Sequence, residues 1–125
     1  MLIPHLHFRG NCAQAIALYE TAFNTKAYDI VSNHDYDPEA YEGNTQIAHA
    51  RMQICDQTVF LNDRADFAHP AHLIVQFPSV EALMACYEHF EGSSKIIDPF
   101  EQAPYMKLGG NFQDKFGIIW GFMAV

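Results

Sequence analysis

Hydrophobic and polar positions divide the chain into short strands and two amphipathic helices. The first predicted strand covers residues 2–8, where Leu6 and Phe8 alternate with His5 and His7. Successive side chains of a strand point to opposite faces of its sheet. The pattern therefore predicts one apolar face, packed on a helix, and one face that carries histidines.

A helix is predicted directly after this strand. Asn11 stands at the cap position, and Gln14 follows three residues later, as in a capping box. Apolar residues then recur every three or four positions, so they share one stripe of the helix. They are Ala15, Leu18, Tyr19, Ala22 and Phe23.

The rest of the first half is predicted to consist of strands and one long loop. Residues 26–32 form a strand, and the polar stretch 33–44 forms a loop because it contains proline and glycine. Residues 45–54 and 58–63 form a hairpin that turns at residues 55–57.

The second half repeats this order of elements. A strand at residues 71–77 precedes a helix that is capped by Ser79 and ends at residues 92–94. The helix has an apolar stripe of Leu83, Tyr87 and Phe90. Three further strands are predicted near residues 95–98, 104–112 and 117–124, with Gly109-Gly110 as a hairpin signal.

Both halves therefore read as strand–helix–strand–strand–strand. The anchor residues correspond, with Phe8 matching Phe77 and Tyr19 matching Tyr87. Each half buries little on its own, so we expect one domain, 1–125, built from the modules 1–66 and 67–125.

Composition limits the classes of partner. The 125 residues include 7 basic and 15 acidic side chains, for a net charge of −8. Binding to nucleic acid requires clustered Lys and Arg, and an anionic membrane surface attracts the same residues, so neither partner is expected. The acidic balance mildly favours neutral or cationic ligands.

The cysteines indicate neither a disulfide framework nor a zinc knuckle. There are three of them, Cys12, Cys55 and Cys86, and no pair has CxxC spacing. Cys12 lies in the first turn of the predicted helix, where a thiolate is favoured, although a buried filler is the simpler interpretation. No secretory leader or apolar run long enough for a membrane span is seen, so we expect a cytoplasmic protein.

Several short motifs together resemble the vicinal oxygen chelate superfamily, also called glyoxalase/bleomycin-resistance/dioxygenase, and most of all its PhnB-like branch. They are Phe8-x-Gly10-Asn11-Cys12, the helix Ala15…Tyr19…Phe23, Ala48-His49-Ala50, Leu61-Asn62-Asp63 and Asp114-x-Phe116-Gly117-x-x-Trp120. The resemblance implies an α+β fold in which two βαβββ modules form a curved mixed sheet around a central pocket. It also implies a homodimer, with modules paired either within or across chains.

Strand alternation then selects candidate ligand-binding residues. The mixed strand faces carry His5, His7, His72 and Gln76, and these faces are expected to line the pocket. His49 lies in the middle of a strand where relatives also have histidine; it either lines the pocket or is a hydrogen-bonded sheet residue. Where many relatives carry Phe-Trp-Gly before the glycine pair, this chain has Pro104-Tyr105-Met106, and Tyr105 would keep an aromatic wall. Trp120 has the opposite parity, which predicts a core position.

The resemblance also allows a test for a metal site. Metal-binding relatives take ligands from the first and last strands of the modules, and His72 falls on one such position. Its counterpart in the first half is Ile3, and the usual last-strand glutamate position is Gly121. We therefore expect no obligatory metal. A divalent ion remains the alternative, with His5 and His72 as ligands, helped by Asp63 or His49.

Three functional hypotheses remain. The first is a module that binds an unknown small molecule without an obligatory metal. The second is a divalent-metal-dependent glyoxalase- or dioxygenase-like enzyme. The third is a metal-free acid–base enzyme that uses His5, His7 or His72 to move a proton, although no orienting partner is visible in the sequence.

Overall fold

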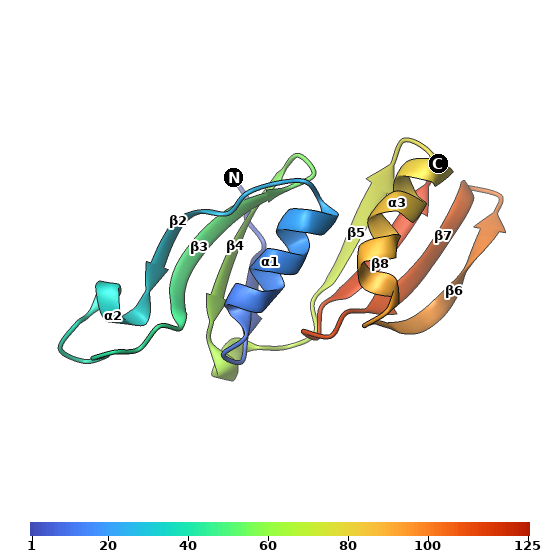
Figure 1. The fold of residues 1–125 in the computed structure, drawn as a ribbon. Coiled ribbons are helices and arrows are strands. Elements are labelled where there is room, and N and C mark those ends of the chain that lie inside the picture. The colour runs from blue at the N-terminus through green and yellow to red at the C-terminus, as the bar shows by residue number, and fades with distance from the viewer. The chain divides into compact units, whose positions relative to one another are not determined.

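The computed structural model describes all 125 residues, Met1–Val125. The chain divides into two compact units, Met1–His69 and Pro70–Val125, each with a four-stranded sheet and one principal helix (Figure 1). This confirms the α+β class predicted from the sequence. None of the helices is both long enough and apolar enough to cross a membrane.

The first unit contains a mixed sheet with the strand order β1-β4-β3-β2. β1 pairs with β4 in parallel, and the other pairs are antiparallel. Its elements are β1 (His5–Phe8), α1 (Cys12–Ala22), β2 (Tyr28–Ser32), α2 (Asn33–Tyr36), β3 (Ile47–Ile54), β4 (Gln57–Asp63) and a final 3₁₀ turn (Ala65–Phe67). The short helix α2 lies where the sequence pattern predicts only a loop.

The second unit repeats the arrangement with the order β5-β8-β7-β6, in which β5 and β8 are parallel. Its elements are β5 (His72–Phe77), α3 (Val80–Glu91), β6 (Lys95–Ala103), β7 (Met106–Gln113) and β8 (Ile119–Ala124). Both units therefore have the predicted βαβββ order.

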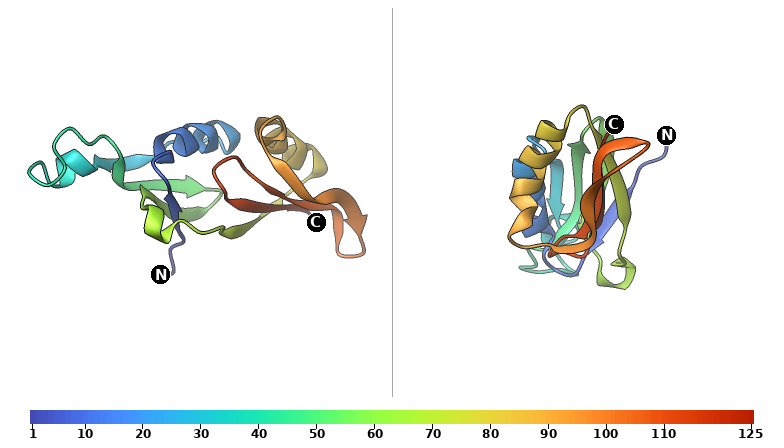
Figure 2. Two further views of the ribbon diagram at one scale, coloured as in Figure 1. Left: turned by 90° about the horizontal axis from the view of Figure 1, so that it is seen from below. Right: turned by 90° about the vertical axis from the view of Figure 1, so that its right-hand side faces the viewer.

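Each helix packs on one face of its own sheet, so each unit has its own core (Figure 2). In β1, Leu6 and Phe8 are buried under α1, as the alternation predicts. In the second unit the core is a cluster of aromatic rings, which includes the fully buried Trp120. The ring centroids in this cluster are 4.9–6.2 Å apart among Phe90, Phe112, Trp120 and Phe122.

The two principal helices begin with different caps. Ser79 caps α3 as predicted, because its Oγ accepts a hydrogen bond from the Ala82 amide at 3.1 Å. The capping box predicted for α1 is wrong, since Asn11 makes no side-chain cap bond. Asp63, at the end of the neighbouring strand β4, takes its place: its Oδ1 accepts from the amides of Gly10 (2.9 Å) and Cys12 (3.0 Å).

The hairpin predicted at Gly109-Gly110 is also wrong. β7 runs straight through both glycines, and the turn lies at Pro104-Tyr105, so β6 is longer than predicted. A Cβ at Gly110 would lie 2.8 Å from the Asp98 carbonyl oxygen, and one at Gly109 would overlap the Met106 sulfur. Close packing of these strands, and not a turn, explains the glycine pair.

A buried carboxylate organises the turn before β8. Asp114 is only 4% exposed, and its Oδ1 accepts from the amides of Phe116 (2.9 Å) and Ile118 (3.0 Å). Its Oδ2 accepts from the Trp120 indole Nε1 at 2.9 Å. The spacing of Asp114, Gly117 and Trp120 therefore follows from one carboxylate that satisfies a turn and a buried indole.

We expect the substitution Asp114→Ala to lower the free energy of unfolding by about 2–4 kcal/mol, because it leaves buried donors without an acceptor. Urea unfolding followed by tryptophan fluorescence measures the change. Asp56→Ala, at an exposed turn position, is the control and should stay within about 0.5 kcal/mol of the parent. Equal stability of the two variants would contradict this role of Asp114.

Candidate functional site

The sheet face opposite α1 carries three of the five histidines of the first unit. His5 and His7 extend from β1, and His49 extends from β3. Phe60 lies between them on β4, with its ring edge-to-face at 5.8 Å from His5 and 5.1 Å from His49. The Arg51 guanidinium lies 5.1 Å from the centroid of the same ring. These contacts hold the imidazoles in fixed positions around an aromatic centre. We call this surface the histidine face.

Asn62 orients His7. The His7 Nδ1 lies 2.6 Å from the Asn62 Oδ1, and the Asn62 Nδ2 donates to the Ala48 carbonyl at 3.5 Å. Because the amide oxygen can only accept, His7 donates through Nδ1, which leaves its neutral ring with a lone pair on Nε2. This is the orienting partner that the sequence did not reveal. Asn62 reaches His7 because the two residues are directly paired in the parallel strands β1 and β4.

His49 has a different partner. The Arg51 Nε donates to the His49 Nε2 at 3.2 Å, so a neutral His49 carries its proton on Nδ1. This bond matches the interpretation of His49 as a hydrogen-bonded sheet residue. His49 also lines a hollow in the first unit, so it can donate to a molecule placed there.

This hollow has a volume of about 790 Å³ and lies between the sheet and the segment around α2. Two of its lining residues are charged, and both already have partners. The Asp63 Oδ2 accepts from the Ile47 amide at 2.9 Å, and Arg64 forms two hydrogen bonds to Asp66 and lies over the Phe67 ring. The lining residues are Val31, Asn33, Tyr36, Tyr41, Ala48, His49, Asn62, Asp63 and Arg64.

In the second unit, the face opposite α3 carries a row of three polar side chains. The His72 Nε2 lies 3.0 Å from the Asn111 Oδ1, and the Asn111 Nδ2 donates to the Asp98 Oδ2 at 2.9 Å. Gly121 lies directly below them. A Cβ at that position would be 2.7 Å from the Asn111 Oδ1 and 3.1 Å from the His72 Nε2. The absence of a side chain at 121 therefore gives room to the His72–Asn111 contact.

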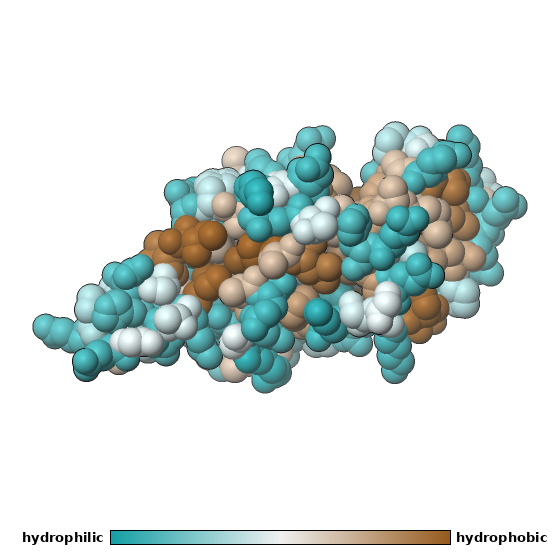
Figure 3. All heavy atoms as spheres, viewed as in Figure 1, coloured by the Kyte–Doolittle hydropathy of each residue, from teal (hydrophilic) through white to brown (hydrophobic).

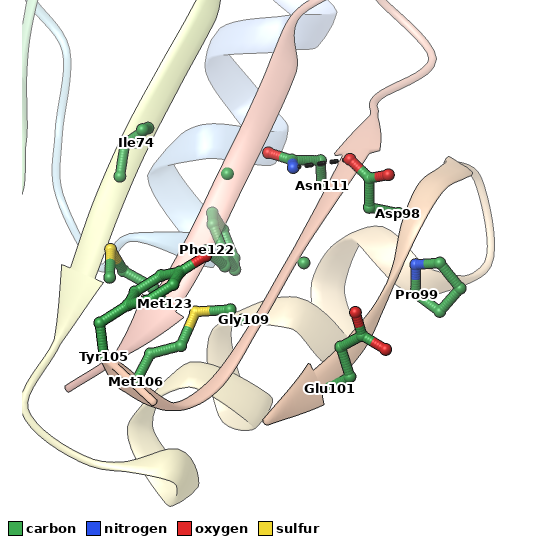
Figure 4. Close-up of a pocket in the computed structure, with 12 residues that line it drawn as sticks. Ile74, Asp98, Pro99, Glu101, Tyr105, Met106, Gly109, Asn111, Phe122 and Met123 are labelled. Carbon is green, nitrogen blue, oxygen red and sulfur yellow. Dashed lines mark hydrogen bonds between the residues drawn. The ribbon is translucent and has the colours of Figure 1, made fainter. Parts of the chain in front are cut away.

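A groove of about 320 Å³ lies beside this row (Figure 4). Tyr105, in the turn between β6 and β7, lines it together with Met106 and Met123. Asp98 and Glu101 line it from β6. The sequence analysis singled out neither acidic residue: Glu101 lies beyond the predicted end of that strand at residue 98, and the partner of Asp98, Asn111, comes from the neighbouring strand β7.

The structure distributes the six candidate residues over both units. His5, His7 and His49 share the histidine face, and only His49 lines the hollow. His72 and Gln76 lie on exposed positions of β5, and Tyr105 lines the groove. Residues that the sequence did not single out complete both sites, above all Asn111 and the tyrosines of the α2 segment.

The donor groups do not fit a divalent metal within either unit. Inside each unit, no group of three or more His, Cys, Asp or Glu side chains is placed to hold an ion. Asp63, a possible ligand by sequence, uses both oxygens on backbone amides. Gly121 offers no donor atom. We therefore derive no chemical step through a metal.

Cys12 is not a reactive thiol. It is completely buried, and burial together with the Asp63 carboxylate raises its pKa far above the ordinary value. This burial confirms the simpler interpretation of Cys12 as a buried filler. A thiolate is disfavoured at this helix N-terminus first by burial and then by the Asp63 carboxylate.

Comparisons with known proteins support the fold. No protein-family model matches the chain. Protein YjdN of Escherichia coli (strain K12) is 23% identical over 134 residues, which cover 95% of this chain and 91% of that protein. The structure of a PhnB protein from Bacillus cereus has a TM-score of 0.83 at 20% identity and covers 99% of this chain and 98% of that one.

A glyoxalase/bleomycin resistance protein from Catenulispora acidiphila is also similar, with a TM-score of 0.61 at 14% identity over 99% of this chain and 96% of that one. These likenesses show that the chain has the same fold as the PhnB protein and the glyoxalase/bleomycin resistance protein, which is the fold that the sequence resemblance implies. At such identities they show the fold alone.

The histidine face makes a prediction about pH. Burial, followed by the charges of His7, His49 and Arg64, lowers the pKa of His5 from 6.5 to about 4. Between pH 6.5 and about 4, His5 is protonated in the unfolded chain and neutral in the folded chain. The free energy of unfolding should therefore fall as the pH drops from 6.5 towards 4. Solvent weakens the effect because His5 is partly exposed.

Imidazole carbon shifts measured by NMR should give a His5 midpoint near pH 4. His5→Gln should remove part of the acid destabilisation, whereas His69→Gln, at an exposed loop position, should leave it unchanged. A His5 midpoint near 6.5 would contradict this account.

Proposed function

We propose that this protein binds a small organic molecule in the hollow of the first unit, without an obligatory divalent metal, and that it acts as a homodimer. The observation that carries the proposal is the hollow itself. Its volume of about 790 Å³ falls within the range of roughly 300–1,000 Å³ that is usual for ligand sites.

The lining of the hollow suits recognition of an organic molecule. Tyr36 and Tyr41 supply aromatic rings from the α2 segment, and Val31 and Ala48 supply apolar surface from the sheet. Ligand sites typically combine such surface with a few polar groups that fix orientation. Here the polar groups come from His49 and the asparagine side chains.

The charge state of the lining favours a neutral ligand. Asp63 is satisfied by backbone amides, and Arg64 is paired with Asp66. Bringing a charged ligand against these groups would compete with bonds that already exist. The His49 Nδ1–H instead offers a donor to a carbonyl or hydroxyl oxygen, so we expect an uncharged, oxygen-containing molecule with a planar part.

The absence of a metal requirement rests on the donor set. The sequence resemblance implies a glutamate at position 121 in metal-binding relatives, and this chain has Gly121 there. Asp63 is committed to backbone amides. The protein of similar fold from Catenulispora acidiphila is named a glyoxalase/bleomycin resistance protein. Resistance to a drug in that protein is consistent with a small-molecule-binding role for this fold.

Exposed apolar side chains support the homodimer. Hydrophobic patches interrupt the polar surface in Figure 3. Ile96 and Ile97 are 42% and 46% exposed on β6, the outer strand of its sheet. An edge strand with apolar side chains is a ready site for pairing with another chain.

A thermal-shift screen of neutral metabolites and antibiotics, followed by calorimetry of the hits, tests the binding proposal. We expect at least one hit whose affinity falls about tenfold or more in His49→Ala and Tyr41→Ala, because each removes a lining contact. His69→Ala is the matched control and should bind like the parent.

The same titration in EDTA tests the metal requirement. Affinity should not change with the chelator present. A screen without hits would contradict the binding proposal, and affinity that is lost in EDTA and restored by nickel, zinc, manganese or iron would contradict the metal-free form of it.

Light scattering after size exclusion tests the dimer. The parent should elute with twice the 14.2 kDa mass of one chain. Ile97→Glu should shift the equilibrium towards the monomer, because it places a charge in the apolar contact. Gln14→Glu adds the same charge at an exposed position of α1 and should not. A parent that stays monomeric over a roughly 100-fold range of concentration would contradict the dimer.

A further inference from the structure

The groove of the second unit is built differently from the hollow of the first. Its floor contains two glycines, Gly109 and Gly121, which are neighbours of Met123 and Asn111 in the ladder between β7 and β8. A Cβ at Gly121 would contact Asn111, His72 and Ile74. The missing side chains therefore let Asn111, His72 and Met106 lie close over the two strands that form the floor of the groove.

One side of the groove is acidic. Asp98 and Glu101 line it from β6, and no lysine or arginine is among its lining residues (Figure 4). Asn111 donates to the Asp98 Oδ2 and so fixes this carboxylate, while the Oδ1 is available to a ligand. Both carboxylates are exposed, so water solvates them until a ligand arrives.

The other side is apolar and aromatic. Ile74, on β5, is 66% exposed, and Tyr105 is 69% exposed. Figure 4 shows Tyr105 close to Met106 and Met123 at one end of the groove. An exposed aromatic ring attracts a cation to its face, and methionine side chains adapt to apolar ligands of irregular shape.

We propose that this groove is a second binding site and that it takes an organic ammonium ion with an apolar or aromatic body. The ammonium group lies between Asp98 and Glu101, and the body lies on Ile74, Met123 and the Tyr105 ring. The net charge of −8 adds a long-range attraction for such a ligand. A bare metal ion lacks the apolar body that this lining selects.

Three small molecules of similar size test the charge rule: 2-phenylethylammonium, 2-phenylethanol and phenylacetate. In calorimetry at low salt, the ammonium should bind about tenfold more tightly than the alcohol, and phenylacetate should not bind, because of the carboxylates. In amide NMR spectra the ammonium should shift Gly109, Gly110 and Gly121.

The double variant Asp98→Asn/Glu101→Gln keeps the shape of the groove and removes its charge. It should weaken binding of 2-phenylethylammonium about five- to tenfold. Glu88→Gln/Glu91→Gln is the matched control, since it removes the same charge from exposed positions of α3. It should bind like the parent. Circular dichroism and thermal unfolding establish that both variants fold.

Four results would overturn the proposal. They are no binding of 2-phenylethylammonium, equal binding of the alcohol or phenylacetate, an equal loss in the α3 control, and a loss of ammonium binding in His49→Ala. The last would place the cation in the first unit. Because that variant tests the hollow separately, the failure of either site leaves the other proposal standing.

Discussion

The carboxylate of Asp63 connects three parts of the first unit that are distant in sequence. It accepts backbone hydrogen bonds from Gly10 and Cys12 at the start of α1, and from Ile47 at the start of β3. Hydrogen bonds to a charged acceptor contribute about 1.5–3 kcal/mol each. They fix where β1 ends and α1 begins, directly after the strand that carries His5 and His7.

The two units share a topology and differ in how they use it. In the first, the residue that pairs with Phe8 on the neighbouring parallel strand is Asp63; in the second, the residue that pairs with Phe77 is Ala124. Because the second helix has its own cap in Ser79, its sheet needs no carboxylate at that point. Two acidic side chains of the second unit, Asp98 and Glu101, instead line the groove.

The period-two and helical patterns were sufficient to predict the strand faces, the helix stripes and the burial of Trp120, because those features depend on local spacing. They did not predict the cap of α1 or the role of Gly109, because both depend on a partner strand. The partners of the histidines were missed for the same reason: Asn62 and Asn111 meet them only through the strand register.

Gly121 shows how a position without a side chain can constrain later change. The space above it is filled by the amide of Asn111 and the ring of His72. A side chain introduced there would displace the Asn111 amide, which in turn holds Asp98. Gaining a carboxylate at this position of the strand would therefore disturb the row of His72, Asn111 and Asp98, so the present polar contacts and a carboxylate at position 121 compete for one space.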